Sequence, residues 1–209
     1  DTRRLAINTG QFIEQGESFL EWPFPIAVTR HKVVQATNPL LRFMLLLDHF
    51  DCLVRFTYLT HEIGAGRLPE IEQMPSLGWW VGKLREAVAD EILFQTVLKI
   101  TEKERVVNIR NEKRGHGWMS ANEESYRGEA EDLEAIIDKI ESELRPVVEN
   151  HRLLIPRKME PTDTCWKVEG ENLIGSHLLH PPFAIEAESD PRSIGITSLN
   201  DIYLSDRKM

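Results

Sequence analysis

The segment from residue 106 to residue 117 carries the side chains best suited to chemistry. Arg110 is followed directly by Asn111, and His116 stands between two glycines six residues after the arginine. Together they offer a permanent cation, an amide and an imidazole that titrates near neutral pH. Such a set can hold a phosphate and move a proton. In the alternative interpretation, Arg sits at a helix C-terminus because of the helix dipole, and Gly-His-Gly is only a turn.

Spacing alone does not distinguish this pair of Arg and His. Three other Arg and His pairs in the chain also have five or six residues between them. The sequence context of the Arg110 pair differs, since only there does Asn follow the Arg and only there do glycines flank the His. The pair also falls between two long predicted helices. This context makes the segment the leading candidate for a functional site.

The chain as a whole is acidic, with 25 Lys and Arg against 34 Asp and Glu and a net charge of −9. Nonspecific binding to nucleic acid requires clustered Lys and Arg, so we expect no general nucleic-acid surface and no DNA target. Any role with nucleic acid would need a local basic site. Five basic residues near the candidate segment provide one: Lys99, Lys103, Arg105, Lys113 and Arg114.

Helix-capping residues, together with helix-breaking Gly and Pro, predict where the helices before residue 106 begin and end. A short helix is expected over residues 25–36. Asn38 as N-cap and Pro39 at the first helical position then begin a long central helix that continues to about residue 63. Its apolar residues cover most of the circumference, which is typical of a helix packed on several sides. Ser76 is expected to cap a third helix with one apolar stripe.

The second half of the helical region is less sharply divided. Residues 92–114 lack Pro and Gly, so one kinked helix or two short ones fit equally well. Ser120 and Glu123 have the spacing of a capping box, which opens a helix that should end near Pro146. The acidic residues between positions 123 and 143 are expected to form a solvated face of that helix.

The composition changes at the C-terminal end, because six of the eleven prolines lie at or after position 146. Short apolar runs separated by Gly, Asn, Asp or Pro are typical of strands and turns. We therefore expect a mainly α fold, with an extension over residues 1–22, a bundle of four to five helices over 23–146 and a small β-rich extension over 147–209. The apolar runs expected to form strands are 153–155, 173–174, 183–185, 194–197 and 202–204.

A polar stripe interrupts the apolar central helix. Asp48, Asp51 and Arg55 follow each other at helical spacing, and burying an unpaired carboxylate is costly. Asp51 and Arg55 could form a structural ion pair across one turn. Alternatively, the stripe faces a cleft with Arg110 and His116 and tunes the pKa of the imidazole.

The Arg110 segment resembles the HEPN (higher eukaryotes and prokaryotes nucleotide-binding) family of all-helical domains. The family hallmark is an Arg, usually followed by Asn, with a His four to six residues further on, as in residues 110–117 here. Residues 24–27, 46–56 and 75–80 add likeness, so the resemblance covers about residues 22–146. The order of these segments along the chain is similar to that in HEPN modules of bacterial conflict and signalling proteins, which often carry a short β-rich extension.

The resemblance implies metal-independent cleavage of RNA, for example a structured RNA such as tRNA, in a bacterial defence, antiviral or toxin-like system. His116 would transfer protons, Arg110 would stabilise the phosphate oxygens and Asn111 would orient the site. The cleft would be shared by a homodimer, with supporting residues Asp48, Asp51, Arg55, Lys113 and Arg114. The alternative is a catalytically silent HEPN-type module that dimerises, binds nucleotides or senses a protein partner within a larger protein.

No pattern indicates a metal or another cofactor. Cys52 and Cys165 form no CxxC motif, which argues against a zinc site or a disulfide framework and suggests a reducing cytoplasm. His177 and His180 would point to opposite faces of a strand, and no third ligand is near them in the sequence. We therefore expect neither a metal ion nor a cofactor.

The most apolar stretch, residues 40–59, is not typical of a membrane span. It contains five Arg, Asp or His residues, which a lipid-exposed helix would not carry. A cytoplasmic protein without a membrane partner is expected. The chain begins with Asp1 rather than Met, so we expect a processed product, a trimmed chain or one domain of a longer protein.

Overall fold

The computed structural model describes residues 22–65, 75–87, 92–115, 123–176, 180–194, 196, 198–199 and 202–206. The chain divides into two compact units. One is the helical unit, Thr29–Val148, and the other combines the described parts of Asp1–Val28 and Glu149–Met209. The protein is mainly helical with a small antiparallel sheet near the C-terminus, as the sequence predicted.

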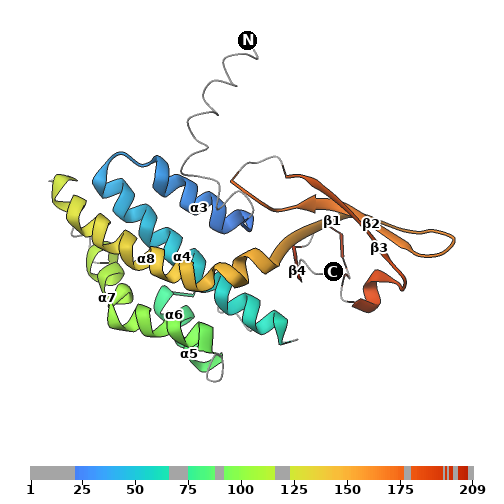
Figure 1. The fold of residues 1–209 in the computed structure, drawn as a ribbon, viewed down its shortest axis with the longest axis horizontal. Coiled ribbons are helices and arrows are strands. Elements are labelled where there is room, and N and C mark those ends of the chain that lie inside the picture. The colour runs from blue at the N-terminus through green and yellow to red at the C-terminus, as the bar shows by residue number, and fades with distance from the viewer. Residues whose placement is uncertain are drawn as a thin grey trace, which may run out of the picture. The chain divides into compact units, whose positions relative to one another are not determined.

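Six α-helices account for most of the described residues before the sheet (Figure 1). Five of them have eleven residues or more, which agrees with the expected four to five main helices. The unit boundaries fall inside the first and the last of these helices. The helices are α3 (Phe24–Gln35), α4 (Pro39–Gly64), α5 (Leu77–Ala87), α6 (Ile92–Lys103), α7 (Val106–Arg110) and α8 (Tyr126–Asn150).

Side-chain caps begin two of the helices where the sequence predicted them. The Asn38 side chain accepts a hydrogen bond from the backbone N–H of Leu41 at 2.9 Å, and Pro39 occupies the first turn of α4. Ser76 Oγ accepts from the backbone N–H of Trp79 at 3.1 Å at the start of α5. Each cap satisfies a backbone donor that has no partner within its helix.

The core of the helical unit lies around α4. Its apolar side chains are buried on several sides, as expected from a helix that is hydrophobic over most of its circumference. Helix α8 instead buries a single stripe, and α5 buries the side that carries Trp80. The largest fully buried side chains of these helices are Phe43, Leu46, Leu47, Phe50, Leu53, Leu77, Leu84, Leu133, Ile137, Ile140 and Leu144.

The prediction that the last helix ends near Pro146 is wrong. Helix α8 continues to Asn150, with Pro146 inside it. A proline removes the hydrogen bond to the carbonyl four residues earlier, here that of Ser142. Both Ser142 and Pro146 are exposed, so water can solvate this carbonyl and the helix continues for one more turn.

The region between α5 and α8 contains two separate helices, one of the two alternatives that the sequence left open. Helix α6 ends before Arg105, whose φ of 53° lies in the left-handed region, and α7 starts one residue later. The chain then winds as a π-helix over Asn111–Gly115. The predicted capping box at Ser120 and the start of the chain to residue 21 lie outside the described residues.

The sheet has four described strands in the order β3-β2-β1-β4, and all neighbours are antiparallel. Two of the expected apolar runs, 153–155 and 183–185, fall within strands, and the run 202–204 overlaps a strand at its last two residues. The run at Leu173 and Ile174 was wrongly predicted as a strand, because it follows a strand that was not foreseen. Of the run 194–197, Ile194 is the last residue of a 3-10 helix, and residues 195 and 197 lie outside the described residues. The strands are β1 (His151–Pro161), β2 (Trp166–Asn172), β3 (Pro182–Ala187) and β4 (Tyr203–Asp206).

One glycine is essential to the pairing of β2. A Cβ atom at Gly170 would lie 2.0 Å from the carbonyl oxygen of Ile155 on β1 and 2.8 Å from the Phe183 ring on β3. Only glycine fits so close a backbone approach.

In the described parts of the chain, no helix combines the length and the apolar character that crossing a membrane requires.

Candidate functional site

Arg110 and Asn111 lie where α7 passes into the π-helix. Arg110 is half-buried and is the last residue of α7, while Asn111 is exposed and is the first residue of the π-helical turn. Arg110 Nη1 donates to Asn111 Oδ1 at 3.4 Å, a long contact between neighbouring residues. A π-helical turn inserts extra backbone into a helix and is frequent at functional sites. The two side chains are therefore close together at the surface of the helical unit.

The other predicted residues of this segment are not all described. Lys113 Nζ lies 2.8 Å from Glu129 Oε1 on α8 and 5.7 Å from the centre of the Tyr126 ring. The hydrogen bond to Glu129 raises the pKa of Lys113, so this ammonium stays charged and is held against α8. His116 and the side chain of Arg114 lie outside the described residues.

The polar stripe of α4 forms the ion pair that was one of its two predicted roles. Arg55 Nη2 donates to Asp51 Oδ2 one turn earlier, and its guanidinium lies 5.5 Å from the centre of the Trp80 ring on α5. No hydrogen bond or ion pair within the described chain joins Asp51 or Arg55 to Arg110. Asp48 is half-buried on the same helix. The structure therefore pairs Asp51 with Arg55 and joins neither residue to Arg110.

A buried polar cluster that sequence reasoning missed lies between α3, α4 and α8. His49 of α4 has no exposed surface, and its two ring nitrogens both have partners. Nδ1 lies 2.7 Å from Thr29 Oγ1 on α3, and Nε2 lies 2.6 Å from Glu141 Oε1 on α8. When Nε2 donates to the carboxylate, Nδ1 accepts from the hydroxyl. The cluster thus satisfies an imidazole in the middle of the core.

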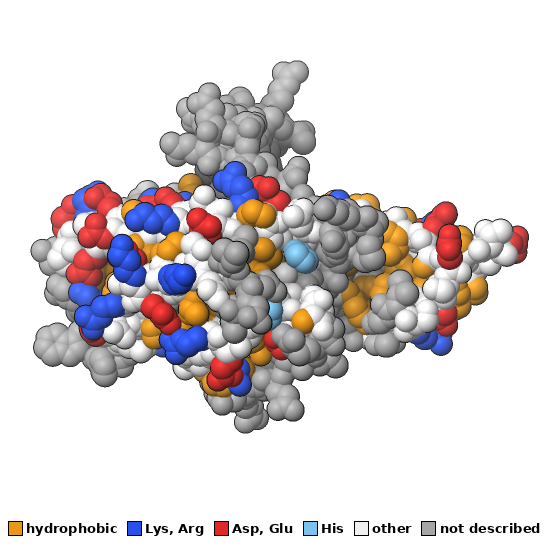
Figure 2. Space-filling view, turned by 60° about the horizontal axis from the view of Figure 1, so that its bottom comes forward, with side chains coloured by type: hydrophobic (Ala, Val, Ile, Leu, Met, Phe, Trp, Pro, Cys, Tyr) orange, Lys and Arg blue, Asp and Glu red, His pale blue; other side chains and the backbone are white. Residues whose placement is uncertain are grey.

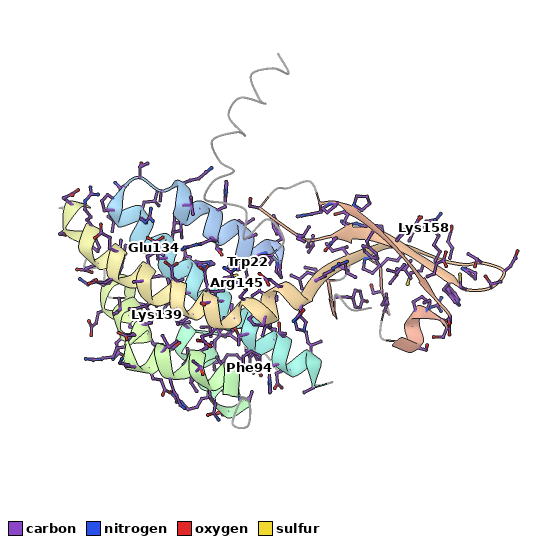
Figure 3. The ribbon with its side chains drawn as sticks, viewed as in Figure 1. Trp22, Phe94, Glu134, Lys139, Arg145 and Lys158 are labelled. Atoms are coloured by element: carbon purple, nitrogen blue, oxygen red, sulfur yellow. The ribbon has the colours of Figure 1, made fainter. Side chains whose placement is uncertain are left out.

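Two arginines extend this cluster along α8. Arg30 of α3 lies 2.7 Å from Asp138 and 3.6 Å from Glu141, and Arg42 of α4 lies 2.6 Å from Glu134. Figure 3 labels Glu134 on α8, the helix whose carboxylates meet both arginines. The expectation of a wholly solvated acidic face is therefore wrong for Glu134 and Glu141, because these two carboxylates bind α3 and α4.

The buried cluster has the groups of a hydrolytic triad but not the access that catalysis needs. The His49 imidazole lies between the Thr29 hydroxyl and the Glu141 carboxylate and contacts both at hydrogen-bond distance. Catalysis requires the reacting groups to reach a substrate atom, whereas His49 is completely enclosed. The cluster therefore holds three helices together, since buried polar groups stabilise a fold only when they are paired.

Arg110 differs from most arginines of the helical unit in its electrostatic environment. Five arginines of this unit pair with carboxylates: Arg30, Arg42, Arg55, Arg85 and Arg127. Within the described chain, Arg110 has no carboxylate partner. Figure 2 shows acidic and basic side chains interspersed over part of the face drawn. An arginine that no carboxylate neutralises is available to an anion.

Comparison of the chain with protein-family models, curated proteins and solved structures finds no match. A function for the chain therefore has to be inferred from the chemistry of its own residues. Arg110 and Asn111 can bind a phosphate through a guanidinium and an amide. In the part of the chain that the structure describes, no group of three or more His, Cys, Asp and Glu side chains could hold a metal ion.

One signal in the sequence could have revealed the buried cluster. His49 lies in α4 among apolar residues that cover most of the helix circumference, and Glu141 lies one turn after Ile137 on the apolar stripe of α8. A polar residue on each of two buried faces indicates that the two could be partners. The same reasoning could not have chosen which of the acidic residues of α8 meets the imidazole.

Proposed function

We propose that this chain is a HEPN-type endoribonuclease that cleaves RNA without a metal ion, in a bacterial defence or toxin-like system. The helical unit and the order of its motifs are compatible with a HEPN-like bundle. The observation that carries the proposal is the guanidinium of Arg110, which lies beside Asn111 and has no carboxylate partner within the described chain. A surface guanidinium of this kind can bind a backbone phosphate of RNA.

The proposed reaction uses the ribose of the substrate as the nucleophile. The 2′-oxygen forms a bond to the adjacent phosphorus while the bond from phosphorus to O5′ breaks. His116 removes the 2′-hydroxyl proton, and a second imidazole protonates O5′. Arg110 stabilises the negative oxygens of the pentacoordinate phosphorus, and Asn111 positions the phosphate. The products are a 2′,3′-cyclic phosphate and a 5′-hydroxyl.

The need for both an acid and a base supports a homodimer. One chain supplies a single His116 in this motif, whereas the reaction uses one imidazole to accept a proton and one to donate it. A twofold axis beside the motif would bring His116 of the partner subunit to the same phosphate. Light scattering at high protein concentration tests this arrangement, and a strictly monomeric particle would contradict it.

The decisive experiment is cleavage of labelled RNA in EDTA by purified protein. We expect cyclic phosphate ends, no cleavage of a 2′-deoxy substrate, and losses of about 10²-fold or more for Arg110→Ala and for His116→Ala. Arg127→Ala is the matched control, because Arg127 is an exposed arginine that pairs with Glu124. Its activity should equal that of the unchanged protein.

Other outcomes would contradict the assignment. Activity that persists in both variants, or that depends on added divalent metal, would show that other residues carry the reaction. Uncut RNA under all conditions, together with a change in oligomeric state in the Arg110 variant, would instead indicate a catalytically silent interaction module.

A further inference from the structure

The helical unit contains an open cleft of about 290 Å³ between α5, the end of α6 and α7. This volume lies near the lower end of the range for small-molecule sites, which is about 300–1,000 Å³, so the cleft suits a small ligand. Arg110 does not line the cleft, which is therefore a different feature from the proposed cleavage site. The lining residues that matter here are Gly78, Gly82, Glu102, Arg105, Val107 and Asn108.

The α5 side of the cleft is apolar and open. A Cβ atom at Gly82 would meet nothing within 4 Å, and one at Gly78 would make ordinary contacts with Ser76 Oγ at 3.8 Å and Val107 Cγ1 at 3.9 Å. Glycine inside a helix lowers its stability relative to alanine, and neither close packing nor a positive φ requires it at these two positions. The two glycines thus leave space beside Val107 that an apolar group of a ligand can occupy.

The α7 side of the cleft carries a cation with one free edge. Arg105 has a φ of 53°, a conformation that is unfavourable for a residue with a side chain. With the Asn108 amide oxygen turned toward it, the Arg105 guanidinium donates from Nε and Nη2 at 3.1 and 3.0 Å. These donors use one edge of the planar group, and no carboxylate within the described chain pairs with the other edge. That edge, formed by Nη1 and Nη2, can bind a carboxylate with two hydrogen bonds.

A carboxylate with one free oxygen lies next to this cation. Arg85 Nε and Nη2 both donate to Glu102 Oε1, at 2.9 and 2.6 Å, whereas Glu102 Oε2 has no partner among the described residues. The backbone N–H of Arg105 donates to the Glu102 carbonyl at 3.1 Å, so the two residues are neighbours in space. The cleft therefore offers one free cationic edge, one free anionic oxygen and an apolar surface.

We propose that this cleft binds a free α-amino acid with an apolar side chain. The α-carboxylate binds the open edge of Arg105, and the α-ammonium donates to Glu102 Oε2. The apolar side chain lies over Gly78 and Gly82 beside Val107. A zwitterion carries its two opposite charges on one carbon atom, which matches a cation and an anion that lie next to each other. This binding activity goes beyond the proposed function and does not depend on it.

Calorimetric titration with L-phenylalanine and three analogues tests each contact. N-acetyl-L-phenylalanine lacks the ammonium and L-phenylalaninamide lacks the carboxylate, so each should bind about tenfold or more weakly than the parent. Glycine keeps both charges but lacks the side chain, and it should also bind about tenfold or more weakly. L-Leucine serves as a second apolar probe, and binding of either parent amino acid would support the inference.

Two substitutions assign the charged contacts to their residues. Arg105→Gln should weaken L-phenylalanine by about tenfold or more but should change the affinity for the amide little, because the amide has no carboxylate to lose. Glu102→Gln should weaken L-phenylalanine but not its N-acetyl derivative, since the new amide oxygen can still accept from Arg85 while the NH₂ group replaces the free acceptor. Lys103→Gln is the control, because Lys103 is an exposed cation of α6 that does not line the cleft.

Filling the cleft provides a matched pair of variants. Gly82→Leu should prevent binding, whereas Gly128→Leu should not, because Gly128 is an exposed glycine of α8 with equally open surroundings that lies outside the cleft. Thermal unfolding of both variants verifies that they are folded. If the Gly82 variant is unfolded, Gly82→Ala takes its place, with a partial loss of affinity expected.

The results separate this inference from the proposed function. Arg110→Ala should leave the affinity for L-phenylalanine unchanged, so amino-acid binding without RNA cleavage would contradict only the proposed function. RNA cleavage by a protein that binds neither L-phenylalanine nor L-leucine would overturn only this inference. Equal affinity for the parent amino acid and both of its blocked derivatives, or binding that is insensitive to Gly82→Leu and Arg105→Gln, would likewise overturn it.

Discussion

His49 Nε2 of α4 lies 2.6 Å from Glu141 Oε1 of α8, although the two residues are 92 positions apart in the chain. The imidazole has no exposed surface and the glutamate is almost fully buried. Each polar group is costly in the core without the other. The pair therefore specifies which side of α8 meets α4.

Removal of one partner should destabilise the helical unit strongly. Glu141→Ala leaves the buried His49 Nε2 without an acceptor, and we expect a decrease of about 3 kcal/mol in the free energy of unfolding. Urea denaturation followed by circular dichroism measures this change. Glu143→Ala is the control, because Glu143 is exposed on the same helix and should shift the stability by less than about 0.5 kcal/mol.

The double variant His49→Leu with Glu141→Leu tests the reason for that loss. It removes both members of the pair, so neither the imidazole nor the carboxylate is left buried without the other. Its destabilisation should be clearly smaller than the sum of the two single substitutions. Additive losses would contradict direct coupling between the two side chains.

The N-cap of α4 should contribute measurably to the free energy of unfolding. Asn38→Ala removes the acceptor for the Leu41 N–H and should cost about 1 kcal/mol in urea denaturation. Thr37→Ala, at the exposed preceding residue, should have little effect. Equal stabilities of the two variants would show that water replaces the cap without cost.

The Cys52 thiol should be unreactive near neutral pH. Burial raises its pKa from an ordinary value of 9.0 to about 11, and the charge of Asp51 adds to the shift while the Thr29 hydrogen bond and Arg55 oppose it. At pH 8 the folded protein then holds about a hundredfold less thiolate than the unfolded chain. Ellman's reagent, used in a Cys165→Ser background, should react slowly until the protein is unfolded.

The same shift predicts how stability depends on pH. The unfolded thiol loses its proton near pH 9.0, before the folded thiol does near pH 11. The contribution of Cys52 is therefore fully present below pH 9 and decreases as the pH rises from about 9 to about 11. Cys52→Ser should remove this part of the alkaline destabilisation. An unchanged alkaline profile would contradict the burial of the thiol.

Glycine substitutions should distinguish positions where a side chain fits from the position where only glycine fits. Gly82→Ala and Gly128→Ala introduce a Cβ into free space within a helix, and each should raise stability by about 0.5–1 kcal/mol. Gly170→Ala should instead destabilise the sheet by about 2 kcal/mol or more, because its Cβ would collide with the carbonyl of Ile155. Thermal unfolding of the three variants measures the contrast.

The sequence alone determined the elements whose signals act within one or two helical turns. The caps at Asn38 and Ser76 bind backbone N–H groups three residues later, so their effect is local and predictable. The ion pair of Asp51 and Arg55 likewise spans a single turn. The mainly helical character and the C-terminal sheet follow from such short-range patterns and from the distribution of proline.

Only the tertiary structure decided the features that join distant parts of the chain. Pro146 stays inside α8 because its surroundings are solvated, and β2 forms from a polar segment because strands on both sides complete its hydrogen bonds. Glu141, and not one of the neighbouring acidic residues, meets His49 because packing of α8 places that position against α4. Contacts of this kind depend on the arrangement of whole elements, which periodicity and capping signals within one segment do not specify.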